Sequence, residues 1–256
     1  MMIHTRHCTA WSIGLLVVGL GIMVVWGLPL QFATARSPDL QTQVKELTDR
    51  VQELEAKLAC MTKDGDEVIF DKCNVHIRSG SGKTDSAVNG LGNLIIGYNE
   101  GSGENIKRTG SHNLVIGPEH AYSSFGGLIV GRENTISAPY ASVSGGRLNT
   151  ASGFAASVSG GSVNTASADF ASVSGGKSNE AKGLDSSVSG GISNMAQGEY
   201  ASISGGSDNA ASGFAASISG GSGNAASGSY TSVSGGRRHS AMEQDNWRAG
   251  SLSEQN

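Results

Sequence analysis

The sequence predicts an all-β protein built as a parallel β-solenoid, or β-roll, of 15-residue coils. The pentapeptide Ser-(Val/Ile)-Ser-Gly-Gly occurs seven times at intervals of 15 residues, beginning at Ser142, Ser157, Ser172, Ser187, Ser202, Ser217 and Ser232. The chain also contains 38 glycines in 256 residues and only 5 % aromatic residues. Small residues at a fixed spacing suit a thin structure whose core is one side chain wide. We expect an N-terminal membrane or signal helix and a short coiled coil before the solenoid.

Residues 1–35 are interpreted as a signal peptide or a transmembrane anchor. Residues 10–30 are apolar and uncharged, and a membrane-spanning helix needs about 20 such residues. Pro29 and the sequence Ala33-Thr34-Ala35 fit a signal peptide and its cleavage site instead. Both alternatives place the rest of the chain outside the cytoplasm, either anchored at the cell surface or secreted.

Residues 38–62 carry an unbroken heptad pattern. Apolar residues follow one another in steps of four and three at Leu40, Val44, Leu47, Val51, Leu54, Leu58 and Met61. Arg50 and Glu55 occupy g and e positions, where they can pair between parallel chains. An amphipathic helix lying on its own domain would need the same stripe, but no third apolar position accompanies it. The pattern therefore favours a coiled-coil stalk and a homo-oligomer, and valine at a with leucine at d is typical of parallel dimers.

Two of the three cysteines follow the apolar segment. Cys60 and Cys73 are close enough in sequence to close a short disulfide loop in an oxidising compartment. Two free thiols are the alternative.

Residues 140–241 are expected to form the regular coils. In the first copy, Ala141 and Val143 lie on the inward face of a short strand, because side chains alternate along a strand. Gly145-Gly146 permit a tight turn with positive φ, and Gly153 turns the chain again.

An asparagine also recurs in each regular coil, at Asn149, Asn164, Asn179, Asn194, Asn209 and Asn224. The asparagines either form a buried ladder along the axis or serve left-handed turns.

Residues 67–139 are expected to form irregular coils of the same solenoid. They contain short β-prone runs that end in glycine, such as Asn93-Leu94-Ile95-Ile96-Gly97. Residues 242–256 include Trp247 and Leu252 and are expected to cap the last coil.

No catalytic, cofactor-binding or metal-binding residue is predicted, and we expect that the protein is not an enzyme. The sequence Gly80-Ser81-Gly82-Lys83-Thr84 resembles part of a phosphate-binding loop. Such a loop needs a further glycine five residues before Gly82, and that position is Ile77 here. The net charge of −4 offers no electrostatic basis for binding nucleic acid. The candidate contact surface is formed by outward serines, namely Ser142, Ser144, Ser157, Ser159, Ser172, Ser174, Ser202, Ser204, Ser217 and Ser219. The aromatic residues Phe154, Phe170, Tyr200, Phe214 and Tyr230 either join this surface or pack between neighbouring coils.

The repeat resembles the YadA-like head of trimeric autotransporter adhesins over about residues 90–241. That family builds its coils around the motif Ser-Val-Ala-Ile-Gly, and the matching residues here are Ser142-Val143-Ser144-Gly145-Gly146 and their copies. The resemblance implies a left-handed parallel β-roll and a trimeric head that sticks to a host or matrix ligand at the bacterial surface. The chain departs from the family because its membrane segment and coiled coil precede the head, and because it ends in SLSEQN without the family's C-terminal anchor.

We therefore expect an extracytoplasmic structural or adhesive surface module, with a rigid head displayed on a coiled-coil stalk. Its partners would be further copies of the chain, with a trimer favoured, a surface ligand, and the membrane if the N-terminal segment is not cleaved. The alternatives are a passive spacer or coat component and a flat-surface binder of the ice-binding type. Surfaces of the ice-binding type generally favour threonine, whose methyl group adds apolar contact, so rows of serine argue against the flat-surface alternative.

Overall fold

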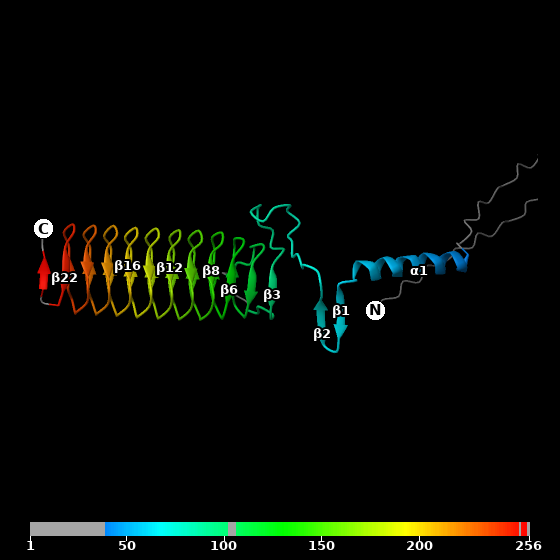
Figure 1. Cartoon of the computed structure of the whole chain (residues 1–256), viewed down its shortest axis with the longest axis horizontal. Coiled ribbons are helices and arrows are strands. Elements are labelled where there is room, and N and C mark those ends of the chain that lie inside the picture. The colour runs from blue at the N-terminus through cyan, green and yellow to red at the C-terminus, as the bar shows by residue number, and fades with distance from the viewer. Residues whose placement is uncertain (1–38, 102–105, 251, 255–256) are drawn as a thin grey trace, which may run out of the picture. The chain divides into compact units, whose positions relative to one another are not determined.

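The computed structural model describes residues 39–101, 106–250 and 252–254 (Figure 1). The chain divides into two compact units, one ending at Cys73 and the other beginning at Asn74, and each is considered by itself. The predicted signal or anchor segment, residues 1–35, lies outside the described residues. Within the described ranges, no helix has both the length and the apolar character needed to cross a bilayer.

The described part of the first unit, residues 39–73, contains a helix followed by a disulfide-closed hairpin. Helix α1 (Leu40–Lys57) is followed by β1 (Met61–Asp64) and β2 (Glu67–Phe70), which pair as antiparallel strands. A disulfide joins Cys60 to Cys73, whose Cα atoms are 6.1 Å apart, and so closes the base of the hairpin. The helix therefore ends before Met61, which we predicted as its last d position. Residues 67–70 likewise belong to this hairpin, and not to the irregular solenoid coils predicted to begin at residue 67.

The second unit is a parallel β-solenoid of about nine coils over residues 114–248, with one long sheet on each side (Figure 1). The 12-stranded sheet contains β3 (Leu94–Ile96), β4 (Leu114–Ile116), β6 (Leu128–Val130), β8 (Ser142–Val143), β10 (Ser157–Val158), β12 (Ser172–Val173), β14 (Ser187–Val188), β16 (Ser202–Ile203), β18 (Ser217–Ile218), β20 (Ser232–Val233), β22 (Trp247–Ala249) and β23 (Leu252–Glu254). The 9-stranded sheet contains β5 (Ala121–Tyr122), β7 (Thr135–Ile136), β9 (Thr150–Ala151), β11 (Thr165–Ala166), β13 (Glu180–Ala181), β15 (Met195–Ala196), β17 (Ala210–Ala211), β19 (Ala225–Ala226) and β21 (Ser240–Ala241). The predicted fold class is confirmed for this unit.

The core of the solenoid is one side chain wide. Each regular coil contributes an inward valine or isoleucine from the 12-stranded sheet, such as Val143, and an inward alanine from the 9-stranded sheet, such as Ala151, and both are fully buried. The register pairs Val143 with Val158 and Ala151 with Ala166, so like residues stack on like residues. This is the arrangement that the alternation in the sequence predicts.

The buried asparagines form a ladder along the axis, as predicted. The backbone N–H of Asn164 donates to the Oδ1 atom of Asn149 at 2.9 Å, and the Oδ1 atom of Asn164 accepts from Asn179 N–H at 2.9 Å. The Nδ2 group of Asn164 donates to the carbonyls of Gly160 and Gly176 at 2.9 and 3.0 Å. Each asparagine thus bonds mainly to backbone, and the turn alternative is wrong because Leu148, the residue before Asn149, has the positive φ of 58°.

Gly153 lies in the second turn of its coil, as predicted, but it is not the left-handed residue of that turn. Gly153 does not have a positive φ; the left-handed residue is Ala155, with φ of 52°. Glycine stands at this point in most coils, where space is short, although residues such as Ala168 and Glu243 occupy the equivalent position in other coils. A Cβ atom on Gly183, the equivalent residue two coils later, would lie 1.9 Å from the carbonyl oxygen of Gly198 in the next coil.

The last coil continues the solenoid further than predicted. Strand β22, which contains Trp247, pairs in parallel with β20. The edge is closed instead by β23, which runs antiparallel to β22. An antiparallel partner ends a parallel stack because it leaves no parallel edge for a further coil.

We predict that Gly183→Ala lowers the stability of the solenoid by roughly 1–3 kcal/mol, because its methyl group would overlap the carbonyl of Gly198 and force the backbone of the two coils to shift. The matched variant is Gly190→Ala, where φ is not positive and an added Cβ meets no atom within 4 Å. That variant should be neutral or more stable by about 0.4–1 kcal/mol. Denaturant unfolding followed by circular dichroism measures both midpoints, and equal midpoints would contradict the close approach of the coils.

Candidate functional site

The ten serines predicted as a contact surface lie on the outward face of the 12-stranded sheet. In each regular coil the first serine of the motif is partly buried and the second is exposed, with the inward aliphatic residue between them. Ser142 pairs with Ser157 and Ser157 with Ser172, so the serines form two straight rows. The structure places on this face Ser142, Ser144, Ser157, Ser159, Ser172, Ser174, Ser202, Ser204, Ser217 and Ser219, and also Ser187, Ser189, Ser232 and Ser234, which we did not select although they have the same motif. We call these fourteen residues the serine face.

The serine face presents hydroxyl groups at a regular spacing of about 4.8 Å along the solenoid. The Oγ atom of Ser217 donates to Ser232 Oγ at 3.2 Å, and the indole N–H of Trp247 donates to Ser234 Oγ at 2.9 Å. In the described part of the chain, no histidine or carboxylate makes a hydrogen bond to a residue of the serine face. The arrangement can therefore donate to and accept from a partner, but it does not activate a serine as a nucleophile.

The outward face of the 9-stranded sheet provides a comparison within the same molecule. Its residues change from coil to coil, from Thr165 to Glu180, Met195 and Ala210 along one row. Neither outward face contributes to the core. The uniformity of the serine face is therefore not a requirement of packing, and it marks this face as the candidate contact surface.

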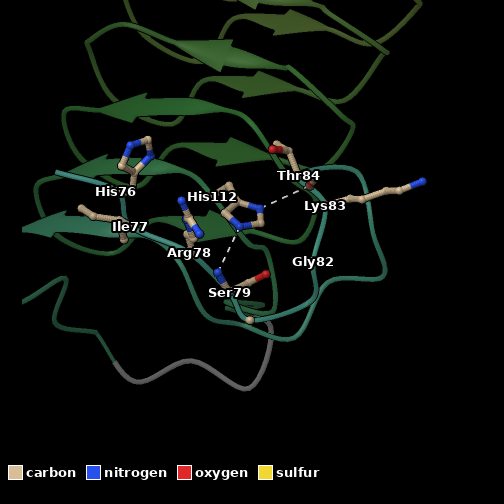
Figure 2. A pocket seen from close by; sticks show the side chains of 9 residues that line it. His76, Ile77, Arg78, Ser79, Gly82, Lys83, Thr84 and His112 are labelled. Carbon is tan, nitrogen blue, oxygen red and sulfur yellow. Dashed lines mark hydrogen bonds between the residues drawn. The ribbon is translucent and has the colours of Figure 1, made fainter. Parts of the chain in front are cut away.

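An open pocket of about 480 Å³ lies among residues of the first part of the solenoid unit (Figure 2). His112 holds its two sides together: its Nε2 atom accepts from the backbone N–H of Ser79 at 3.1 Å, and its Nδ1 atom lies 3.2 Å from the carbonyl oxygen of Thr84. These contacts require the neutral ring with the proton on Nδ1. The lining residues are His76, Ile77, Arg78, Ser79, Gly80, Gly82, Lys83, Thr84 and His112.

The pocket does not have the architecture of a phosphate-binding loop. Gly80 and Gly82 adopt positive φ values of 81° and 89°, as turn residues do. The next regular element is strand β3, so no helix presents its N-terminus to a bound phosphate. Lys83 extends away from Arg78 and His112 in Figure 2, so its ammonium group does not point towards the guanidinium group or the imidazole ring.

A second histidine, His120, replaces asparagine in the buried ladder. Its Nδ1 atom accepts from the backbone N–H of Asn134 at 3.2 Å, and its Nε2 group donates to the carbonyl of Ile116 at 3.0 Å. A regular asparagine makes the same two contacts through its Oδ1 and Nδ2 atoms. Burial lowers the pKa of His120 below its ordinary value, because the charged ring would lose both water and its acceptor atom. No sequence signal indicated this role, since the spacing around residue 120 is irregular.

We predict that the first coils lose stability as the pH falls below about 6.5, the ordinary pKa of histidine. The folded chain keeps His120 neutral while the unfolded chain takes up a proton, so the free energy of unfolding rises with pH in this range. An asparagine at this position would keep the ladder contacts without titrating, so His120→Asn should remove this part of the pH dependence. Amide hydrogen exchange at Val115 and Ile129 at pH 7.5 and 5.5 measures the effect, with the C-terminal coils as an internal control. An unchanged pH dependence in the variant would contradict the prediction.

Residues 39–101 and 106–250 contain no group of three or more histidine, cysteine or carboxylate side chains arranged to hold a metal ion. Comparison with models of known protein families and with curated proteins finds no match to this chain.

Proposed function

We propose that the chain is an extracytoplasmic structural or adhesive surface module, in which copies joined through α1 display the solenoid as a rigid head. The observation that carries the proposal is the exposure of α1. None of its residues is buried, and its a and d side chains, from Leu40 to Leu58, are 48–71 % exposed. An 18-residue helix is only marginally stable alone in water. Its apolar stripe therefore requires a partner, and further copies of the same helix fit it.

The shape and chemistry of α1 support a parallel coiled coil. Val44, Leu47 and Val51 line a shallow apolar groove, and Glu55 lies at its edge. Heptad spacing places such residues where they pack into the facing helix, while Arg50 and Glu55 flank the seam with opposite charges. We propose a trimer, which the resemblance to the adhesin heads favours.

The disulfide between Cys60 and Cys73 supports a location outside the cytoplasm. Disulfides persist in oxidising compartments and are rare where glutathione and thioredoxin keep thiols reduced. This agrees with the proposal that residues 1–35 act as a signal peptide or an anchor, since either would export the solenoid.

The serine face supports the adhesive part of the proposal. Each regular coil presents the same pair of serine hydroxyl groups, and oligomerisation would increase the number of such pairs in one assembly. Weak contacts repeated along such an array bind strongly through avidity when the partner is itself repetitive. The same regularity favours the flat-surface alternative, in which the partner is an ordered solid.

We predict that the full chain, kept in mild detergent, has three times the single-chain mass of 26.1 kDa by light scattering. Leu47→Lys with Leu54→Lys should raise the protein concentration at which the oligomer dissociates by at least about tenfold, because two apolar contacts of the seam are lost. The matched control is Thr42→Lys with Asp49→Lys, on the opposite side of the helix. A single-chain mass for the unaltered protein would overturn the proposal.

We also predict that cells displaying the chain adhere to immobilised matrix or host-cell surfaces through the serine face. Lysine at Ser159, Ser174 and Ser204 should abolish adhesion, because the long side chains would hold a partner away from the hydroxyl rows. Lysine at Ser167, Ser212 and Ser227, outward on the other sheet, is the control and should leave adhesion intact. Adhesion that survives deletion of residues 90–241 would contradict the adhesive role, and a lack of adhesion by the unaltered chain would favour the spacer alternative.

A further inference from the structure

One edge of the solenoid carries a row of rings that a single leucine interrupts. We call this row the aromatic edge, and it consists of Phe125, Tyr140, Phe154, Phe170, Leu184, Tyr200, Phe214 and Tyr230. Neighbouring rings meet edge to face, with centroids 5.3–5.5 Å apart and planes at 73–87°. Leu184 takes the place of a ring between Phe170 and Tyr200. The rings predicted either to contact a partner or to pack between coils therefore do pack between coils.

The rings alternate between two positions of the turn. Tyr140, Phe170 and Tyr200 are themselves the left-handed residues of their turns, with φ of 57–59°. Phe154 and Phe214 instead stand one residue before the left-handed Ala155 and Ala215. The alternation has a physical reason, because stacked strands rise only about 4.8 Å while edge-to-face rings need a somewhat larger offset between centroids.

Packing between coils does not hide these rings from solvent. From Tyr140 to Tyr230 the exposed fraction of the members lies between 37 % for Phe214 and 56 % for Tyr230. Monomeric proteins rarely expose a long contiguous apolar row, and such rows commonly mark interaction surfaces. Tyrosine and phenylalanine are also enriched at the centres of protein interfaces.

The charges in the turns of the aromatic edge are mainly negative. Asp169, Asp185, Glu199 and Asp245 lie there, and the cation beside them, Lys182, is paired with Glu180. None of these four carboxylates makes an ion pair within the described residues. The edge therefore presents apolar rings among unpaired negative charges.

The other edge of the solenoid, formed by the first turn of each coil, has the complementary character. We call it the basic edge. It carries the cations Arg132, Arg147, Lys177, Arg237 and Arg238 and the carboxylates Glu119, Glu133 and Asp208. Glu119 pairs with Arg132, and Glu133 pairs with Arg132 and Arg147. Exposed aliphatic side chains lie between these cations, namely Leu148 at 43 %, Val163 at 44 % and Ile192 at 55 %. The two turns of a coil lie at opposite ends of its strands, so the two edges run along opposite sides (Figure 1).

We infer that the aromatic edge of one copy docks against the basic edge of the next, so that parallel copies lie side by side. The inference rests on the proposed self-association through α1, which would hold the copies parallel and close together. Because the two edges lie on opposite sides of the solenoid, this contact between two different surfaces arranges the copies in a row. In such a row the same coil levels meet, which sets the turn containing Leu184 beside the turns containing Lys177 and Ile192 of its neighbour.

The charges distinguish this arrangement from one in which aromatic edges meet each other. Contact between two aromatic edges would bring Asp169, Asp185 and Glu199 of each copy towards the same carboxylates of another. Like charges facing one another across an interface destabilise it. Contact with the basic edge at the same coil levels brings Asp169 and Asp185 towards Lys177, and it brings Asp245 towards Arg237 and Arg238. Glu199 then lies level with Asp208. The contact also covers both rows of exposed apolar side chains.

Cysteine cross-linking in the full chain tests the inference. The background is Cys8→Ser, in which Cys60 and Cys73 are joined to each other. The test variant is Leu184→Cys with Ile192→Cys, treated with a short bis-maleimide and run on a denaturing gel. The controls are each single substitution and Leu184→Cys with Ser174→Cys, which places the second thiol on the serine face. Light scattering of each variant before cross-linking records whether the copies associate.

The expected result is covalent oligomers up to the full assembly for the test variant, and single chains for every control. Covalent dimers from Leu184→Cys alone would show that aromatic edges face each other and would overturn the inference. Associated chains in which the test variant cross-links no better than the controls would also overturn it, while leaving the proposed function standing. Chains that do not associate at all would overturn both.

Discussion

The hydrogen bonds of the buried asparagines are the interaction on which the rest of the solenoid depends. A left-handed residue such as Leu148 turns the chain between two short strands, and its own N–H bonds back to Arg132 in the previous coil. The N–H of the following asparagine then also faces the previous coil, where the acceptor is another asparagine side chain. A thin core cannot leave such a group without a partner, because a buried unpaired N–H costs about 1–3 kcal/mol. The ladder thus allows a tight turn inside a stack of two-residue strands.

The spacing between coils is the second constraint, and it acts through sterics. Where the backbone of one coil lies directly on the next, as at Gly183 and Gly198, an added Cβ atom would come within 1.9 Å of a carbonyl oxygen. Where side chains stack at the same spacing, small or slender ones succeed, as with Val143 on Val158. In the regular coils of residues 140–241 the bulky rings lie at the turns, where they can be offset along the chain, whereas Tyr122 is buried in a strand of an earlier, irregular coil. The low aromatic content of the regular repeats therefore follows from the spacing.

Much of this architecture could be predicted from the sequence, because strand alternation and the 15-residue period are local patterns. They indicated the inward residues, the outward serines and the position of the asparagines. The left-handed residues could not be found in this way, since Leu148, Ala155 and Phe170 carry no common side-chain signal and are held there by bonds to neighbouring coils. The substitution of His120 for asparagine and the pocket at His112 were missed for a similar reason. Each of these two features depends on segments that are far apart in sequence. Met61 was assigned to the helix because a heptad pattern does not show where a disulfide-closed hairpin begins.

The alternating rings bear on how this protein can change in length. Each coil bonds only to the coil before and after it, so a solenoid of this kind can gain or lose repeats without disturbing distant parts. Insertion of a single coil would place two successive rings at the same turn position and spoil their edge-to-face contact. Insertion of two coils, or 30 residues, would preserve the alternation along the whole edge. The unit in which such a chain grows by duplication is then a pair of coils, although the motif that repeats most visibly in its sequence is half as long.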